Sequence, residues 1–120
     1  MHEVALIQGI LTTCFQQAGQ EQAVAIRSIT LEIGQFAGIS EEALQFGFDV
    51  AKRGTLASES ILKIEGVIAQ GTCSVCGARL YGVESLDECK HCGGRLALES
   101  GRELRIKSME IEECVKTVAV

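Results

Sequence analysis

Two C-x-x-C pairs constrain this chain more than any other feature, because they fix where four sulfur ligands can meet. Twelve residues separate the pairs, which are formed by Cys73 and Cys76, and by Cys89 and Cys92. Each C-x-x-C turn can direct two thiolates at one point, and two turns supply the tetrahedral sulfur set that zinc accepts. Gly77 and Gly93-Gly94 follow the two pairs and allow the positive φ such turns use. The spacing predicts a structural zinc site, because a closed four-cysteine site leaves no open position for catalysis.

Two other arrangements of four cysteines compete with zinc: a pair of disulfides and a rubredoxin-like iron site. The first residues show no basic segment followed by an apolar stretch and a cleavage site, so we expect a cytoplasmic protein with reduced thiols. Reduced thiols disfavour disulfides. Iron also takes four thiolates, and only the lack of any other redox motif argues against it. Zinc is therefore the preferred metal and iron stays open.

Three further metal-binding side chains are expected to be structural or solvent-exposed. Cys14 and Cys114 each lie within an apolar pattern far from the cluster, as small buried residues do. His91 lies between Cys89 and Cys92, where an exposed turn residue is more common than a histidine that exchanges with a thiolate.

Composition excludes several classes of function. The 120 residues are 47% hydrophobic without any run of eighteen apolar residues, so no membrane-spanning helix is expected. The formal net charge of -5 disfavours a nucleic acid as partner, because a phosphate backbone would be repelled. No nucleophile motif or phosphate-binding loop occurs, so the sequence does not support an enzyme.

Hydrophobic periodicity predicts two helices and three strands around the cysteine region. The helices are expected from Glu3 to about Ala18 and from the N-cap Ser40 to Gly54, and the strands at Ile29–Gly34, Ile61–Ile68 and Glu103–Glu112. Val24 and Ile26 have the opposite parity to Ile29, so the first strand either starts late, is bulged or is covered on both faces.

The last strand has its own change of parity, which predicts a bulge near Lys107-Ser108. Its polar-apolar alternation resembles that of Ile61–Ile68, and we expect these two strands to pair. The cysteine region would then be a module inserted between two paired strands.

The expected fold class is α+β, with a small three-stranded mixed sheet, two helices on one face and an inserted zinc-ribbon module. We expect one domain to comprise residues 1–69 and 104–120, and the zinc ribbon to comprise residues 70–103. The ribbon is too short to bury a core of its own, so the metal must supply much of its folding free energy.

The segment Met1-His2-Glu3 is a second group of candidate metal ligands. It lies at the start of the first expected helix, and no leader is expected before it. A free α-amine, the His2 imidazole and the backbone nitrogens of His2 and Glu3 can converge on one ion. Square-planar nitrogen donors are what Ni(II) and Cu(II) prefer. From residue types alone, however, a second-position histidine is more often a solvated terminus.

The combination of these features closely resembles the HypA family, the nickel-insertion accessory proteins of [NiFe]-hydrogenase maturation that in some organisms also serve urease. The resemblance covers the whole chain and rests on M-H-E at the start, an apolar helix after it, the spacing of the cysteines, L-E-I-G at Leu31–Gly34 and F-x-F-D at Phe46–Asp49. Many family members have proline after the third cysteine, where this chain has Lys90.

This resemblance implies that His2 is the nickel ligand with Glu3 beside it, and that the four cysteines hold structural zinc. It implies a metallochaperone without a reaction of its own, which passes Ni(II) to the hydrogenase large-subunit precursor together with a maturation GTPase. The oligomeric state, a homodimer included, stays open. The competing hypothesis is a zinc-ribbon adaptor that binds protein or nucleic acid, with no role for nickel.

Overall fold

The computed structural model describes residues 3–83, 86 and 88–113. The chain divides into two compact units, one of Met1–Leu31, Ile39–Ile64 and Ile106–Val120, the other of Glu32–Gly38 and Glu65–Arg105. No helix in the described part of the chain is long and apolar enough to cross a membrane. The expected domain boundaries at residues 69/70 and 103/104 stay a prediction.

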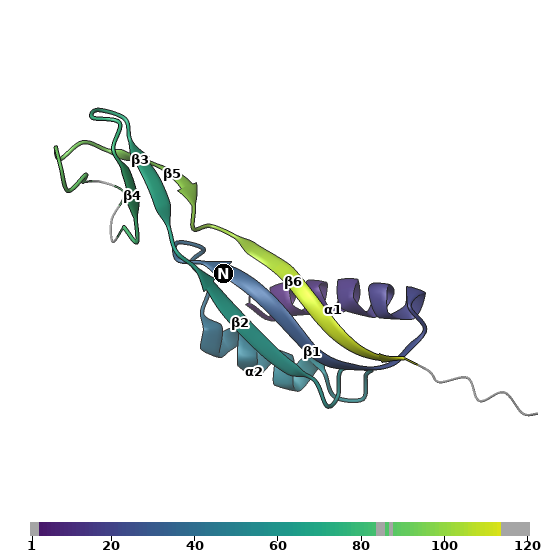
Figure 1. Ribbon diagram of the computed structural model, residues 1–120. Helices are drawn as coiled ribbons and strands as arrows, with labels where there is room; N and C mark the ends of the chain where they lie inside the picture. Colours follow the sequence, from purple (N-terminus) through teal and green to yellow (C-terminus); the bar gives the residue numbers. More distant parts are fainter. Residues whose placement is uncertain (1–2, 84–85, 87, 114–120) are drawn as a thin grey trace, which may run out of the picture. The chain divides into compact units, whose positions relative to one another are not determined.

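Both predicted helices are present and lie on the same side of the first sheet (Figure 1). Helix α1 (Glu3–Gln20) buries Ile7, Leu11, Cys14 and Ala18, the stripe expected of an amphipathic helix. Helix α2 (Glu41–Ala51) begins after Ser40, whose side chain accepts a hydrogen bond from the Ala43 N–H at 3.2 Å. The two helices pack against each other.

The first sheet has three strands in the order β2-β1-β6. Strand β1 is Ala23–Gly34, β2 is Ile61–Val67 and β6 is Leu104–Glu113. Strand β1 runs parallel to β2 and antiparallel to β6, so the sheet is mixed as expected (Figure 1). The expected pairing of β2 with β6 is wrong, because β1 lies between them. Similar alternation in two strands reflects a similar half-buried setting rather than adjacency.

Strand β1 starts six residues before the expected Ile29, so a late start is ruled out. Arg27 pairs with Glu112, and Ser28 donates to Glu110, although Glu110 and Glu112 lie on one face of β6. Adjacent residues of a regular strand point to opposite faces, so this pattern indicates a bulge at Arg27–Ser28. Ser28, Ile29, Thr30 and Leu31 are buried in succession, so both faces of β1 are covered in this stretch, which is another of the expected alternatives.

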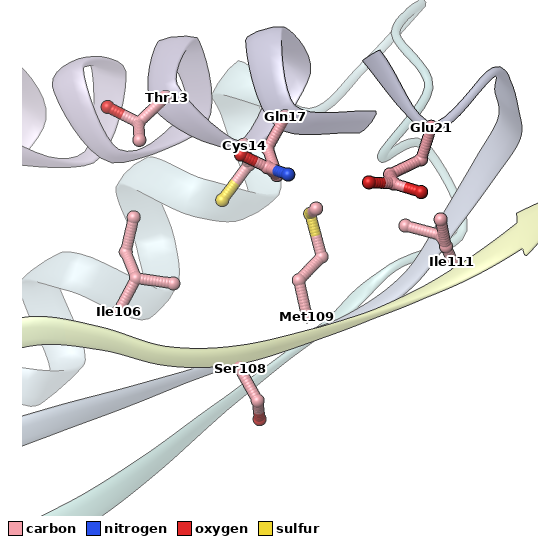
Figure 2. Close-up of a pocket in the computed structure, with 8 residues that line it drawn as sticks. All are labelled: Thr13, Cys14, Gln17, Glu21, Ile106, Ser108, Met109 and Ile111. Atoms are coloured by element: carbon pink, nitrogen blue, oxygen red, sulfur yellow. The ribbon is translucent and has the colours of Figure 1, made fainter. Parts of the chain in front are cut away.

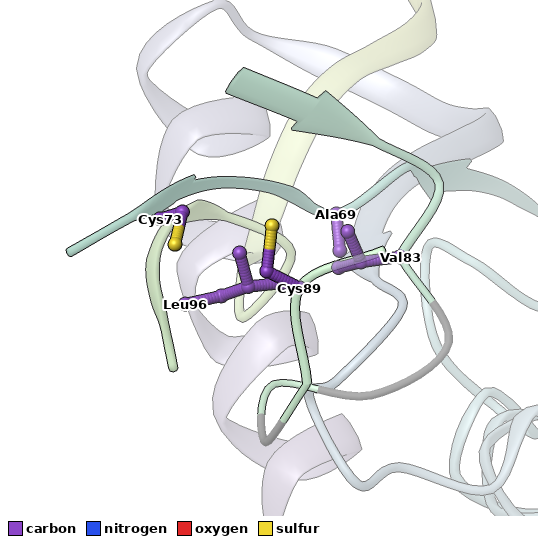
Figure 3. Packing of buried hydrophobic residues seen from close by; sticks show 5 residues of the cluster. All are labelled: Ala69, Cys73, Val83, Cys89 and Leu96. Atoms are coloured by element: carbon purple, nitrogen blue, oxygen red, sulfur yellow. The ribbon is translucent and has the colours of Figure 1, made fainter. Parts of the chain in front are cut away.

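The second sheet has the order β4-β3-β5, with β3 at Gln70–Cys73, β4 at Arg79–Tyr81 and β5 at Leu96–Ser100. Both outer strands pair antiparallel with β3. No strand was predicted for the segments of β4 and β5, because three to five residues are too few to show alternation. A small core of Ala69, Cys73, Val83, Cys89 and Leu96 forms beside this sheet (Figure 3).

Candidate metal centre

The two C-x-x-C turns have the same backbone structure. In the first turn, Cys73–Ala78, the Cys73 N–H donates to the Ala78 carbonyl at 2.9 Å and the Gly77 N–H donates to the Cys73 carbonyl at 3.0 Å. In the second turn, Cys89–Gly94, the corresponding bonds from Cys89 to Gly94 and from Gly93 to Cys89 measure 2.7 and 2.8 Å. We call these turns the first and second knuckle.

The glycines after each cysteine pair are required by this geometry. Gly77 and Gly93 occupy equivalent positions with φ of 75° and 76°, in the left-handed region that favours glycine. Gly94 has a different role, because a Cβ there would lie 2.7 Å from the Val75 side chain and 3.1 Å from the Cys73 Sγ atom. The absence of a side chain at Gly94 therefore lets the two knuckles approach.

All four sulfur atoms lie within 4.8 Å of one another. The Sγ atoms of Cys73 and Cys92 are 3.4 Å apart, and those of Cys76 and Cys89 are 3.8 Å apart. A disulfide would require about 2.05 Å. Four sulfurs at about 2.3 Å from a tetrahedral zinc ion are about 3.8 Å from each other. The separations therefore match a four-thiolate metal site, and the cysteines are free thiols.

Backbone amides surround the sulfurs and stabilise negative charge on them. The Val75 and Cys76 N–H groups donate to Cys73 Sγ, and the His91 N–H donates to Cys89 Sγ, each at 3.4 Å. The Gly94 N–H donates to Cys92 Sγ, also at 3.4 Å. These bonds favour thiolates, which are the form that coordinates metal.

The pKa values of two thiols in the cluster are shifted in opposite directions. The Cys76 backbone N–H lowers the pKa of Cys73 to about 6. At Cys92 the Gly94 N–H also acts to lower the pKa, but the neighbouring thiols of Cys73 and Cys76 raise it to about 12. The first thiolate is thus favoured and the last is opposed by charge already present. A divalent metal would remove this opposition, so the donor set fits a structural metal ion.

His91 is exposed and contributes its backbone N–H, and its side chain is not part of the group of candidate ligands. Cys14 is buried in α1, as expected, whereas Cys114 lies outside the described residues. Within residues 3–83, 86 and 88–113 the four cysteines form the only cluster of three or more His, Cys, Asp or Glu ligand atoms.

The predicted nickel ligand His2 also lies outside the described residues. Glu3 is the first residue of α1, and its Oε1 atom accepts a hydrogen bond from the Ser40 backbone N–H at 3.3 Å. Ser40 is the N-cap of α2, so the carboxylate joins the starts of the two helices. This contact could not be predicted from the sequence, since two residues 37 positions apart form no local pattern.

Comparison with known proteins decides the family. The profile described as "Hydrogenase/urease nickel incorporation, metallochaperone, hypA" matches residues 1–111. The chain belongs to the HypA family. The "Hydrogenase maturation factor HypA" of Acidithiobacillus ferrooxidans (strain ATCC 53993 / BNL-5-31) is 41% identical over 113 residues, which cover 93% of this chain and 100% of that protein. The HypA of Rhodobacter capsulatus is 38% identical over 112 residues, 92% of this chain and 99% of that protein.

Solved HypA structures have the same fold. The solution structure of the Ni metallochaperone HypA from Helicobacter pylori has a TM-score of 0.67 at 22% identity, covering 94% of this chain and 99% of that one. A second HypA solution structure has a TM-score of 0.69 at 20% identity, covering 92% and 96%. HypA proteins are metallochaperones of hydrogenase maturation, and this family member is accordingly not an enzyme.

Proposed function

We propose that this chain is a nickel metallochaperone that binds Ni(II) through His2 and Glu3 and delivers it to the [NiFe]-hydrogenase large-subunit precursor. It works in the cytoplasm with a maturation GTPase. The observation that carries the proposal is the family match, which begins at residue 1 and so includes Met1-His2-Glu3. The same segment supplies the nitrogen donors that Ni(II) prefers.

The ligand set explains why nickel would be held and then released. The α-amine, the backbone nitrogens and the His2 imidazole are all donors on one short segment of the chain, so few bonds need to be exchanged when nickel is transferred. The amine and imidazole must be deprotonated, so affinity should rise above about pH 6. The bond from the Ser40 N–H to Glu3 supports this proposal, because it ties the residue after His2 to a fixed point in the same unit.

Zinc is the metal we assign to Cys73, Cys76, Cys89 and Cys92. Its role is structural, since all four positions are filled by protein sulfurs and no site remains for a substrate. The small core of the second unit supports this role, because the buried residues that the structure describes there, with the half-buried hydrophobic residues packed against them, bury too little apolar surface to hold the two knuckles together alone. Metal analysis of the purified protein separates zinc from iron, and an iron site would also be coloured.

The nickel site is tested by moving the α-amine. A Gly-Ser extension before Met1 leaves His2 and Glu3 in the chain but removes the amine from its position next to them. We expect the extended protein to lose nickel binding measured by calorimetry, with its zinc content unchanged. Unchanged nickel binding would contradict the proposal and favour an adaptor in which His2 has no role.

Delivery is tested with the zinc- and nickel-loaded protein, the hydrogenase large-subunit precursor and the maturation GTPase. We expect nickel to appear in the precursor, measured after separation of the proteins, and the His2→Ala variant to give no transfer above free nickel. Equal transfer by both proteins would show that the N-terminus is not the donor.

A further inference from the structure

A cavity of about 370 Å³ lies between helix α1 and strand β6. Ile106, Met109 and Ile111 of β6 point toward α1, whose Cys14 side chain points back at the strand (Figure 2). The remaining lining residues, mostly on α1, are polar. The wall formed by β6 is therefore apolar where it faces the helix, and it suits an apolar side chain better than an ion or a charged ligand.

The apolar side chains of β6 are packed less completely than those of β1. Ile29 and Leu31 of β1 are 0% exposed, whereas none of the described residues of β6, 104–113, is fully buried. Strand β6 is an edge of its sheet, since β1 is the one strand in the described part of the chain that pairs with it. Further cover at this edge would stabilise the first unit, because burial of apolar surface is favourable.

The chain itself has an apolar segment directly after this strand. Strand β6 ends at Glu113, and residues 114–120 read C-V-K-T-V-A-V, with Lys116 as the one charged side chain. A short run of this composition is typical of a segment buried against a core. The segment lies beyond the HypA family match, which ends at residue 111, so membership of the family does not assign it a place.

We propose that residues 114–120 turn back after β6 and cover the cavity, with the side chains of Val118 and Val120 against Met109 and Ile111. In an extended segment alternate side chains point the same way, so Val118 and Val120 share one side and Thr117 points to the other.

The length of the segment fits this place. Seven extended residues span about 23 Å, and Met109 lies about 14 Å back along β6 from Glu113. The segment can therefore spend two or three residues on a turn and still reach Met109. Val115 falls within that turn, which leaves Val118 and Val120 as the valines that reach the cavity.

Attachment to β6 favours this segment over a separate molecule. A tether of a few residues holds the valines beside the cavity at an effective concentration on the order of millimolar. A free partner of equal affinity cannot displace them at lower concentrations. Covering an edge with a loop is also one of the ways in which proteins prevent unwanted strand pairing.

Methyl NMR of the full-length, zinc-loaded protein tests the contact directly. The chain has two methionines, so the methyl signal of Met109 is readily distinguished from that of Met1. We expect NOEs from the Val118 and Val120 methyl groups to those of Met109 and Ile111. An equimolar mixture of isotope-labelled and unlabelled protein, filtered for contacts between copies, should show none of these NOEs.

Two neighbouring substitutions test the predicted side of the segment. Val118→Asp places a charge against the apolar wall, so the thermal unfolding midpoint of the first unit should fall by about 4 °C or more. A chain ending at Glu113, which retains all of β6, should show a similar fall. Thr117→Asp adds the same charge on the side away from the cavity and should leave the midpoint unchanged.

Three results would overturn the proposal. Absence of NOEs between the valines and β6 would mean that the segment does not cover the cavity. NOEs seen only between labelled and unlabelled copies would make a second chain the occupant. Equal midpoints for Val118→Asp, Thr117→Asp and the parent would show that Val118 is not buried.

Discussion

The Sγ atoms of Cys73 and Cys92 lie 3.4 Å apart although the two residues are 19 positions apart in the chain. The Sγ atoms of Cys76 and Cys89 approach to 3.8 Å, so both close contacts join one knuckle to the other. Thiolates at these separations repel each other unless a cation lies between them. The metal is therefore expected to hold the second unit together, and its removal should destabilise that unit.

Cys73→Ala should abolish zinc binding and disorder the second unit, while the first unit stays folded. Structural zinc contributes a folding free energy on the order of ten kcal/mol, far more than the small core beside it can replace. Metal analysis gives the zinc content, and amide NMR spectra show which residues lose dispersion. Cys14→Ala is the matched control and should keep its zinc, because Cys14 lies in α1. Loss of zinc in the control would contradict the assignment of ligands.

Cys14 should make the stability of the first unit fall at high pH. Burial raises the pKa of this thiol from 9.0 to about 11, so the folded state opposes its ionisation. The neutral thiol makes its full contribution to the free energy of unfolding below pH 9. This contribution, at most about 3 kcal/mol, is lost as the pH rises toward 11. Urea unfolding at pH 8 and pH 10.5 measures this loss, and Cys14→Ala should show less of it. An equal loss in both proteins would exclude Cys14 as the cause.

Ser40→Ala should destabilise the first unit by about 1 kcal/mol. The serine side chain accepts from the Ala43 N–H at the start of α2, and alanine leaves that donor without its partner. Ser40→Asp retains an acceptor and should behave like the parent in thermal unfolding. Neither change removes the Ser40 backbone N–H that donates to Glu3, so nickel affinity should be the same in all three proteins.

Gly34→Ala should lower the free energy of unfolding by about 3 kcal/mol or more, although it adds only one methyl group. A Cβ at Gly34 would overlap the backbone of Gly101 and Arg102, which cannot move as a flexible side chain could. The matched control is Gly9→Ala in α1, where nothing lies within 4 Å and alanine should stabilise the helix by about 0.5 to 1 kcal/mol. Similar unfolding midpoints for the two variants would show that the close approach at Gly34 does not exist.

The features that could be predicted from the sequence are those whose own residues carry a local pattern. Periodicity predicts α1 and α2, and residue types predict the cap at Ser40, which the bond from the Ala43 N–H confirms. The spacing of the four cysteines predicted that they meet. Strands β4 and β5 were missed because their burial depends on the cysteine cluster rather than on their own alternation.

Order within the sheet was not predictable in the same way. Strand β1 separates β2 from β6, and no residue pattern in those two strands distinguishes being neighbours from sharing a neighbour. The contact between Glu3 and Ser40 and the need for Gly94 between the knuckles are also tertiary properties. His2 lies outside the described residues. Its role is inferred from the chemistry of its donor atoms and from membership of the family, and a binding experiment must test it.

That experiment is a nickel titration of zinc-loaded protein with its native Met1, followed by calorimetry and absorbance, beside His2→Ala at the same pH. The account predicts one equivalent of Ni(II) bound at micromolar affinity or tighter by the parent and none by the variant, with zinc content and fold equal in both. Equal nickel binding by the two proteins, or none by either, would contradict the central claim that the N-terminus is the nickel site.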